Sequence, residues 1–202
     1  MITILDYGMG NLGSIANMLK KLGCASKITS DLEEIEQAEK LILPGVGSYA
    51  QAMKNLNEMN VIPLLESKSA NKIPILGICL GMQLLASNSE EGHVPGLNLI
   101  PGNVVKFVLP NTLKVPHMGW NTIQYKGDCK LFQGFQNLEE VRYYFVHSYH
   151  FQPELPEYQI ASANYGMEFT CGVQKGNVYG VQFHPEKSHA FGMRLLQNFS
   201  QL

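Results

Sequence analysis

A cysteine between two glycines is the strongest chemical signal in this sequence. Residues 74–85 read PILGICLGMQLL, so Gly77, Cys79 and Gly81 form a G-x-C-x-G pattern where one apolar run ends and the next begins. A strand before the pattern and a helix after it would make a nucleophile elbow, the sharp turn that raises a reactive side chain above a sheet. A side chain at either glycine would collide with the neighbouring helix or strand. A small buried cysteine in a tight turn is the alternative reading of these residues.

The expected position of Cys79 suits a reactive thiol. The start of a helix presents unpaired N–H groups and a partial positive charge, and both favour a thiolate. The N–H of Leu80, the next residue, can bind an oxyanion. These features predict that Cys79 is a nucleophile.

A candidate base and its orienting group lie near the end of the chain. Residues 181–188 read VQFHPEKS. Pro185 favours an extended backbone at His184, and residues i and i+2 of an extended chain point to the same side. We therefore expect Glu186 beside His184, holding one ring nitrogen while the other faces the thiol. A salt bridge at a strand end would explain the pair alone, but together with Cys79 the sequence predicts a Cys–His–Glu triad.

The first half of the chain alternates two kinds of segment that could position this triad. Strand-like runs cover residues 2–7, 26–30, 40–45 and 73–79. Helix-like runs cover residues 11–22, 50–59 and 61–70, and another begins near Gly81. Such alternation is typical of a parallel sheet with helices on both faces.

The second half has short strand-like runs separated by turns, at residues 103–108, 121–126, 142–151, 158–165, 169–174 and 178–184. Gly176 and its neighbours, KGN, suit a hairpin turn between the last two runs. Phe191, Leu195 and Phe199 are spaced as on one face of a closing helix. We expect an α/β fold with a mixed, largely parallel central sheet and helices on both faces, in one domain of residues 1–202.

Composition excludes several classes of function. The chain has 202 residues, a net charge of −2 and 16% charged residues, so it has no basic patch for nucleic acid. Its apolar runs have the length of strands, too short to cross a membrane, and its N-terminal residues lack the pattern of a signal peptide. The cysteines, Cys24, Cys79, Cys129 and Cys171, form no C-x-x-C pair. We expect no metal, no cofactor, no disulfide framework and a cytoplasmic location.

Several separated motifs resemble one enzyme family. DYGMGN, LPGVG, GICLGMQLL, PHMGWN, YFVHSYH and QFHPEKS are similar to motifs of the class I (triad) glutamine amidotransferases. GMQ after the cysteine, with PHMGWN and FVHSY, resembles more narrowly the glutaminase subunits of imidazole glycerol phosphate synthase. The resemblance runs from Asp6 to the last helix and implies a flavodoxin-like α/β fold.

The resemblance implies a role for particular residues. Cys79 would attack the side-chain amide of glutamine, His184 would move the proton and Glu186 would orient His184, giving glutamate and ammonia through a thioester. Val46 and Gly47 would join Leu80 in binding the oxyanion. The glutamine pocket would be lined by Gln83, Glu91, His147, Ser148 and Tyr149. From local sequence alone, a tight turn after a strand is an equally natural reading of Val46 and Gly47. Glu91 could instead be a solvated loop carboxylate, and His147 and Tyr149 could simply be strand residues.

The resemblance also implies a protein partner. Family members form a heterodimer with a (β/α)8 cyclase subunit, which receives the ammonia for histidine biosynthesis. Asn11, Met118, Trp120 and Lys187 match positions near that interface. Packing in the core is the ordinary explanation for a lone tryptophan such as Trp120.

Three other readings stay open. Residues 8–13, GMGNLG, match the G-x-G-x-x-G pattern of dinucleotide-binding modules, and Asp31 could bind a ribose. A cysteine peptidase or thioesterase would use the same nucleophile. A paralogous amidotransferase subunit would supply ammonia to a different acceptor, for instance in surface-sugar amidination.

Overall fold

The computed structural model describes residues 1–110, 112–136 and 138–202. Five parallel strands form its centre: β1 (Ile2–Leu5), β2 (Ser26–Thr29), β3 (Lys40–Leu43), β4 (Ile75–Ile78) and β13 (Val178–Val181), in the order β2-β1-β3-β4-β13. The last of these strands in sequence therefore lies beside β4, which leads to the elbow cysteine.

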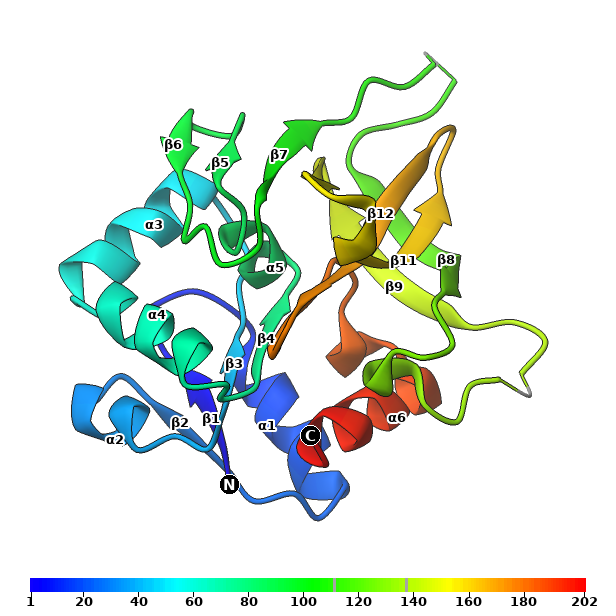
Figure 1. Cartoon of the computed structure of the whole chain (residues 1–202). Coiled ribbons are helices and arrows are strands. Elements are labelled where there is room, and N and C mark those ends of the chain that lie inside the picture. The colour runs from blue at the N-terminus through cyan, green and yellow to red at the C-terminus, as the bar shows by residue number, and fades with distance from the viewer. Residues whose placement is uncertain (111, 137) are drawn as a thin grey trace.

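Helices cover both faces of the parallel strands, as the sequence predicted (Figure 1). Strand side chains alternate between faces, so Ile42 packs in a different apolar cluster from Leu41 and Leu43. α1 (Leu12–Lys21) and α6 (His189–Ser200) pack on one side, and α2 (Leu32–Glu36), α3 (Tyr49–Glu58) and α4 (Ile62–Ala70) pack on the other. The predicted apolar face of the closing helix is confirmed, since Leu195 and Phe199 are fully buried.

The second half is mainly antiparallel, which makes the whole sheet mixed, as expected. β13 pairs with β12 (Glu168–Lys175), and the sheet continues through β10 (Tyr149–Pro153), β7 (Gly102–Lys106), β5 (Asn88–Ser89) and β6 (Val94–Pro95). β11 (Gln159–Asn164) links β12 to β8 (His117–Tyr125), which pairs with β9 (Arg142–His147). Gly176 (φ 59°) and Asn177 connect β12 to β13, confirming the predicted hairpin.

The strand-like run at residues 142–151 is two strands rather than one. The chain breaks at Ser148, where it leaves the pairing of β9 with β8 and joins β10 to β7 and β12. Local sequence favours one long strand because aromatic and β-branched residues, which suit a strand, lie on both sides of the break. The change of neighbours places His147, Ser148 and Tyr149 near the elbow cysteine. In the part of the chain that is described, no helix has the length and apolarity needed to cross a membrane.

Candidate active site

Cys79 occupies a strained turn between β4 and the short helix α5 (Leu80–Leu84). Its backbone has φ 55° and ψ −110°, a combination that L-residues rarely adopt. Such conformations cost on the order of 1–3 kcal/mol and occur most often at functional sites. The predicted strand–elbow–helix context is therefore present, although α5 has five residues.

The two flanking glycines permit this turn by close backbone contact, as predicted. A Cβ placed on Gly77 would lie 2.5 Å from the carbonyl oxygen of Gly81, and one on Gly81 would lie 1.8 Å from that of Leu43. Backbone atoms cannot move aside as flexible side chains can. Glycine is thus required at both positions to bring α5 against the ends of β3 and β4.

His184 and Glu186 are adjacent, but not for the predicted reason. His184 has an extended backbone (φ −102°, ψ 96°), whereas residues Pro185–Lys187 form a 3₁₀ turn. The expectation of an extended segment reaching Glu186 was wrong. The turn itself brings the Glu186 carboxylate back to the ring, with His184 Nδ1 2.7 Å from Oε1 of Glu186. Pro185 supplies the fixed φ that suits the first position of such a turn.

The hydrogen bond to Glu186 leaves the second nitrogen of His184 available. Because Nδ1 donates its proton to the carboxylate, neutral His184 has a lone pair on Nε2. This buried nitrogen has no hydrogen-bond partner among the described residues. Burial tends to lower the pKa of His184, but Cys79 and Glu186 outweigh that effect and raise the pKa to about 10. The site therefore favours the protonated form of the imidazole.

A cavity of about 320 Å³ brings together Cys79, His184 and the residues predicted to bind the substrate and the oxyanion. Its lining includes Val46, Gly47, Leu80, Gln83, Glu91, His147, Ser148 and Tyr149, with Pro116 and Val146 in addition. Residues separated by more than one hundred positions in sequence thus surround one space. Glu186 lies behind His184, outside this lining.

Glu91 offers a carboxylate at one side of the cavity. It is half-buried, and burial raises its pKa, an effect partly offset by a hydrogen bond from the backbone N–H of Tyr49. A carboxylate in this position can bind an ammonium group of a ligand. The half-buried position of Glu91 at the cavity is more consistent with the substrate-binding role that the resemblance implies than with a solvated loop carboxylate.

His147 belongs to a buried hydrogen-bond chain that sequence reasoning missed. Its Nδ1 lies 2.8 Å from the carbonyl oxygen of Tyr149, and its Nε2 lies 2.9 Å from Nδ1 of His117. Since a carbonyl only accepts, His147 carries its proton on Nδ1, and His117 donates to Nε2. Asn121 Nδ2, 3.3 Å from Nε2 of His117, completes a consistent neutral chain. Burial lowers the pKa of His117 to about 4.

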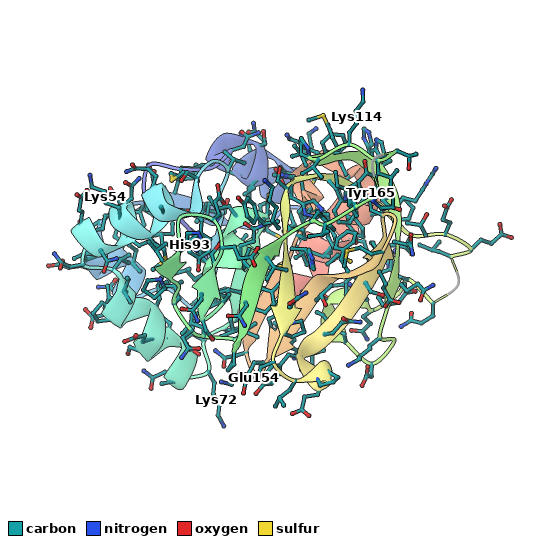
Figure 2. All side chains as sticks on the ribbon, turned by 90° about the horizontal axis from the view of Figure 1, so that it is seen from above. Lys54, Lys72, His93, Lys114, Glu154 and Tyr165 are labelled. Atoms are coloured by element: carbon teal, nitrogen blue, oxygen red, sulfur yellow. The ribbon has the colours of Figure 1, made fainter. Side chains whose placement is uncertain are left out.

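Aromatic rings enclose His117 and support this chain. Tyr165 stacks on it with ring centroids 4.2 Å apart, and its hydroxyl donates to the carbonyl of Lys114 over 2.9 Å. Figure 2 shows Lys114 and Tyr165 near each other on the β-rich side of the molecule. His117 lies in the PHMGWN motif, but its contact with His147 depends on the pairing of β8 with β9, which the motif does not reveal.

The LPGVG segment lies directly against the elbow. A Cβ on Gly45 would be 2.9 Å from the Cβ of Leu80, and the Tyr7 hydroxyl donates to the carbonyl of Pro44 over 2.6 Å. Tyr7 was not predicted to contribute. Val46 is 42% exposed and Gly47 has φ 111°, so the segment leaves the sheet at the cavity wall.

The four residues predicted to face a partner are all exposed. Met118 and Trp120 project from β8 with 61% and 46% of their surface exposed, and Asn11 and Lys187 are also exposed. The Trp120 ring stacks on His189 at 5.5 Å and meets Tyr144 edge-on at 6.3 Å, while Lys187 lies over the ring of Tyr144. Core packing therefore does not explain Trp120.

The structure does not favour the dinucleotide-binding alternative. Asp31 caps α2, accepting hydrogen bonds from the backbone N–H groups of Glu33 and Glu34. A Cβ on Gly13 would meet nothing within 4 Å, so the third glycine of the pattern has no close helix–strand contact to permit. Within the described ranges, no group of three or more His, Cys, Asp and Glu side chains is arranged to hold a metal ion.

Comparison with curated proteins found full-length relatives. Imidazole glycerol phosphate synthase subunit HisH 2 of Methanococcus maripaludis is 52% identical over 200 residues, covering 98% of each chain. Subunit HisH of Bdellovibrio bacteriovorus is 48% identical and subunit HisH 2 of Pseudomonas aeruginosa is 46% identical, each covering 100% of both chains.

Solved structures share the fold at lower identity. A structure described as glutamine amidotransferase gives a TM-score of 0.77 with 19% identity, covering 99% of this chain and 97% of the other. The structure of PurLQS from Thermotoga maritima gives 0.76 with 18% identity, covering 98% and 96%. The model of the family "Glutamine amidotransferase class-I" matches residues 3–201. By this match and by its full-length relatives, the chain belongs to the class I glutamine amidotransferase family.

Proposed function

We propose that this chain is the glutaminase subunit of an imidazole glycerol phosphate synthase. One observation supports the chemistry above all: Cys79, on a strained elbow, shares a cavity with His184, whose other ring nitrogen is bonded to Glu186. The family relationship and the relatives' shared name support the biological assignment.

In the first half-reaction, the thiolate of Cys79 attacks the side-chain amide carbon of glutamine. The negative charge passes from sulfur to the amide oxygen, where the N–H of Leu80 and an N–H of the Val46–Gly47 segment can bind it. Protonated His184 gives its Nε2 proton to the amide nitrogen, which leaves as ammonia. A glutamyl thioester and a neutral imidazole remain.

In the second half-reaction, neutral His184 takes a proton from water as the water oxygen attacks the thioester. The new tetrahedral intermediate expels the Cys79 thiolate and releases glutamate. Glu186 keeps the imidazole oriented and stabilises its charged form in both steps. The net reaction converts glutamine and water into glutamate and ammonia, and the enzyme returns to its starting state.

The cavity provides groups for holding glutamine. Glu91 suits the α-ammonium group, as its carboxylate faces the same space as Cys79. Ser148 and Tyr149 line the cavity at the strand break, and the His117–His147 chain holds the Tyr149 carbonyl in place. Gln83 is fixed by the same carbonyl, to which its Nε2 donates over 3.1 Å.

We further propose a heterodimer with a (β/α)8 cyclase subunit in the cytoplasm. Ammonia released into water would be protonated and lost, so a partner must receive it directly. The surface cluster of Met118, Trp120, Lys187 and His189, together with the half-buried Tyr144, is a suitable docking surface, because methionine and aromatic side chains are enriched at interface centres. Four free cysteines are compatible with a reducing compartment.

Reconstitution tests this proposal. The chain is combined with the cyclase subunit encoded in the same genome and given glutamine carrying ¹⁵N in its side-chain amide, with the cyclase's nucleotide substrate. We expect glutamate and ¹⁵N-labelled imidazole glycerol phosphate in equal amounts. Glutamate without labelled product would contradict the assigned pathway while leaving the glutaminase intact.

A second acceptor is the other candidate. Two of the relatives, from Methanococcus maripaludis and Pseudomonas aeruginosa, have names numbered as a second HisH, so such chains occur in more than one copy per organism. A copy of this kind could supply ammonia for another amidination, such as that of a surface sugar. Complementation of a histidine auxotroph lacking its glutaminase subunit, with the matching cyclase supplied, separates the two. Growth without histidine supports the first candidate.

A further inference from the structure

Gln182 lies beside the nucleophile, and none of the steps above uses it. It follows the last residue of β13, where the parallel pairing of Val181 with Ile78 brings it level with Cys79. Its side chain is fully buried, with Nε2 3.8 Å from Cys79 Sγ and Oε1 2.9 Å from Nε2 of Gln83. The amide therefore connects the sulfur to a second glutamine of the cavity.

Gln83 determines which end of the Gln182 amide faces the sulfur. The Gln83 nitrogen donates to the carbonyl of Tyr149, and this partner can only accept. The second N–H of the same nitrogen then points to Gln182, which must present its oxygen there. The N–H group of Gln182 is consequently directed to the sulfur of Cys79, with no freedom to exchange the two ends.

This contact discriminates between the two forms of the sulfur. A thiol can donate its proton to the carbonyl of Val146, 3.9 Å away. A thiolate can only accept, so the carbonyl becomes unfavourable and the N–H of Gln182 becomes a charge-assisted donor. A hydrogen bond that strengthens with charge favours the charged form.

We propose that Gln182 is a further catalytic residue, whose side-chain N–H holds the sulfur of Cys79 in its ionised, attacking form. The same N–H stabilises the sulfur when the second tetrahedral intermediate expels it as a thiolate. The inference rests on the proposed glutaminase reaction for its catalytic meaning, but the contact with sulfur can be tested without that reaction.

Other titratable groups around this sulfur remain in place in the tests. His184 and Tyr7 both interact electrostatically with Cys79, and His147 and Glu91 line the same cavity. Replacing Gln182 by Met keeps a side chain of similar length and volume. It removes the N–H donor without adding a charge. Any change in the charge state of the sulfur can then be assigned to the missing N–H.

The first test measures alkylation of Cys79 by iodoacetamide as a function of pH, quantified on the Cys79 peptide by mass spectrometry. The thiolate is the reactive form. Gln182→Met should move the midpoint of the alkylation profile to higher pH by roughly one unit, the size expected for one hydrogen bond to a charged group. An unchanged midpoint would overturn the proposal, whatever reaction the protein catalyses.

The second test is steady-state glutaminase kinetics in the reconstituted complex. Gln182→Met should lower kcat/KM roughly tenfold at neutral pH. The loss should shrink as the pH rises and the sulfur ionises without help. A loss that is constant over the whole pH range would indicate damage to packing alone and would contradict the proposal.

Two further variants keep these tests decisive. Gln174→Met is the matched control: Gln174 accepts a hydrogen bond from another cysteine, Cys129, over 3.5 Å, away from the cavity. It should leave the alkylation of Cys79 unchanged. Gln83→Met leaves Gln182 present but frees its amide to turn, so it should shift the midpoint in the same direction by less. If Gln182→Met does not fold, an unshifted midpoint in Gln83→Met overturns the proposal.

Discussion

At the scale of single residues, Cys79 meets a steric demand and a chemical demand at once. Its positive φ strains the backbone, while its largely buried side chain must face the cavity that it shares with His184. Glycine would satisfy the backbone better but has no sulfur. The strain is thus a cost of placing a nucleophile where backbone N–H groups can reach the developing oxyanion.

Replacing Cys79 separates these two demands. Cys79→Ala should abolish glutamine hydrolysis and leave synthesis from added ammonia intact, because the cyclase reaction needs only ammonia. Cys79→Gly should also be inactive but more stable than Cys79→Ala by about 1 kcal/mol, since glycine adopts positive φ without strain. Product assays with both nitrogen sources and thermal unfolding measure these effects. Full glutaminase activity in either variant would exclude Cys79 as nucleophile. Cys24→Ser is the control, because Cys24 is half-buried and lies outside any G-x-C-x-G pattern.

The pair of His184 and Glu186 should show graded losses. His184→Ala removes proton transfer, worth roughly 10²–10⁴-fold, and Glu186→Gln should cost less because it acts through the ring. Glu186 raises the pKa of His184, so Glu186→Gln should move the alkaline limb of the kcat profile to lower pH. Rate profiles from pH 6 to 10 test this order. A larger loss in Glu186→Gln than in His184→Ala would reverse the assigned roles.

At the scale of elements, the LPGVG segment is anchored at one end and has an exposed residue between two glycines at the other. Tyr7 holds the Pro44 carbonyl, and Gly45 packs against Leu80, so the segment is anchored where it leaves β3. Beyond that point, Val46 is exposed and lies between two glycines. The peptides around Val46 can therefore rotate at small steric cost and present either an N–H or a carbonyl to the cavity.

This arrangement predicts control of the glutaminase by its partner. The isolated subunit should turn over glutamine slowly, and the complex with its acceptor ligand should be faster by roughly 10²–10³-fold, the effect of one oxyanion donor. The ligand must bind the active orientation more tightly for this to occur, with Asn11 and Lys187 as candidate relays from the partner. Glutamate release is measured for the subunit, the complex and the liganded complex. Equal rates in all three would contradict the gating.

The elements also show where sequence reasoning succeeds and where it cannot. The strand, elbow and helix around Cys79 were predictable because glycine pattern and apolar runs are local signals. The strand break at Ser148 and the contacts of Gln182 and His117 depend on which strands become neighbours, and no local pattern encodes that. Glu186 was placed correctly beside His184 through a wrong local argument, because a 3₁₀ turn gives the same adjacency as the expected extended chain.

At the scale of the whole molecule, buried histidines whose pKa values shift in opposite directions make the stability of the native state depend on pH. Burial lowers the pKa of His117 to about 4 and that of His147 to about 3. In contrast, Cys79 and Glu186 raise the pKa of His184 to about 10. The unfolded value is about 6.5 for all three. His117 and His147, whose pKa values are lowered by folding, contribute fully to the stability of the native state above pH 6.5. Their contribution falls as the pH drops toward 3–4. His184, whose pKa is raised by folding, contributes fully to the stability of the native state below pH 6.5. Its contribution falls as the pH rises toward 10.

The melting temperature should therefore peak near pH 6.5 as far as these groups determine it, and decline on both sides. Between pH 5 and 6.5, where most carboxylates stay ionised, the acid limb should flatten in His117→Gln, although that variant is less stable throughout. His184→Gln should flatten the alkaline limb instead. Calorimetry across pH 5 to 10 provides the measurement. An acid limb with unchanged slope in His117→Gln would show that His117 does not titrate on unfolding.

The central place of β13 also affects how the protein is made. β13 pairs with β4 on one side and β12 on the other, so the sheet around the nucleophile cannot close until residues 178–181 have left the ribosome. Until then the edge of β4 has no β13 partner, and an open strand edge invites aggregation. His184 arrives within the same stretch of chain as this last central strand. A partly synthesised chain thus has the cysteine without its base, and glutamine hydrolysis begins only when the fold is nearly finished.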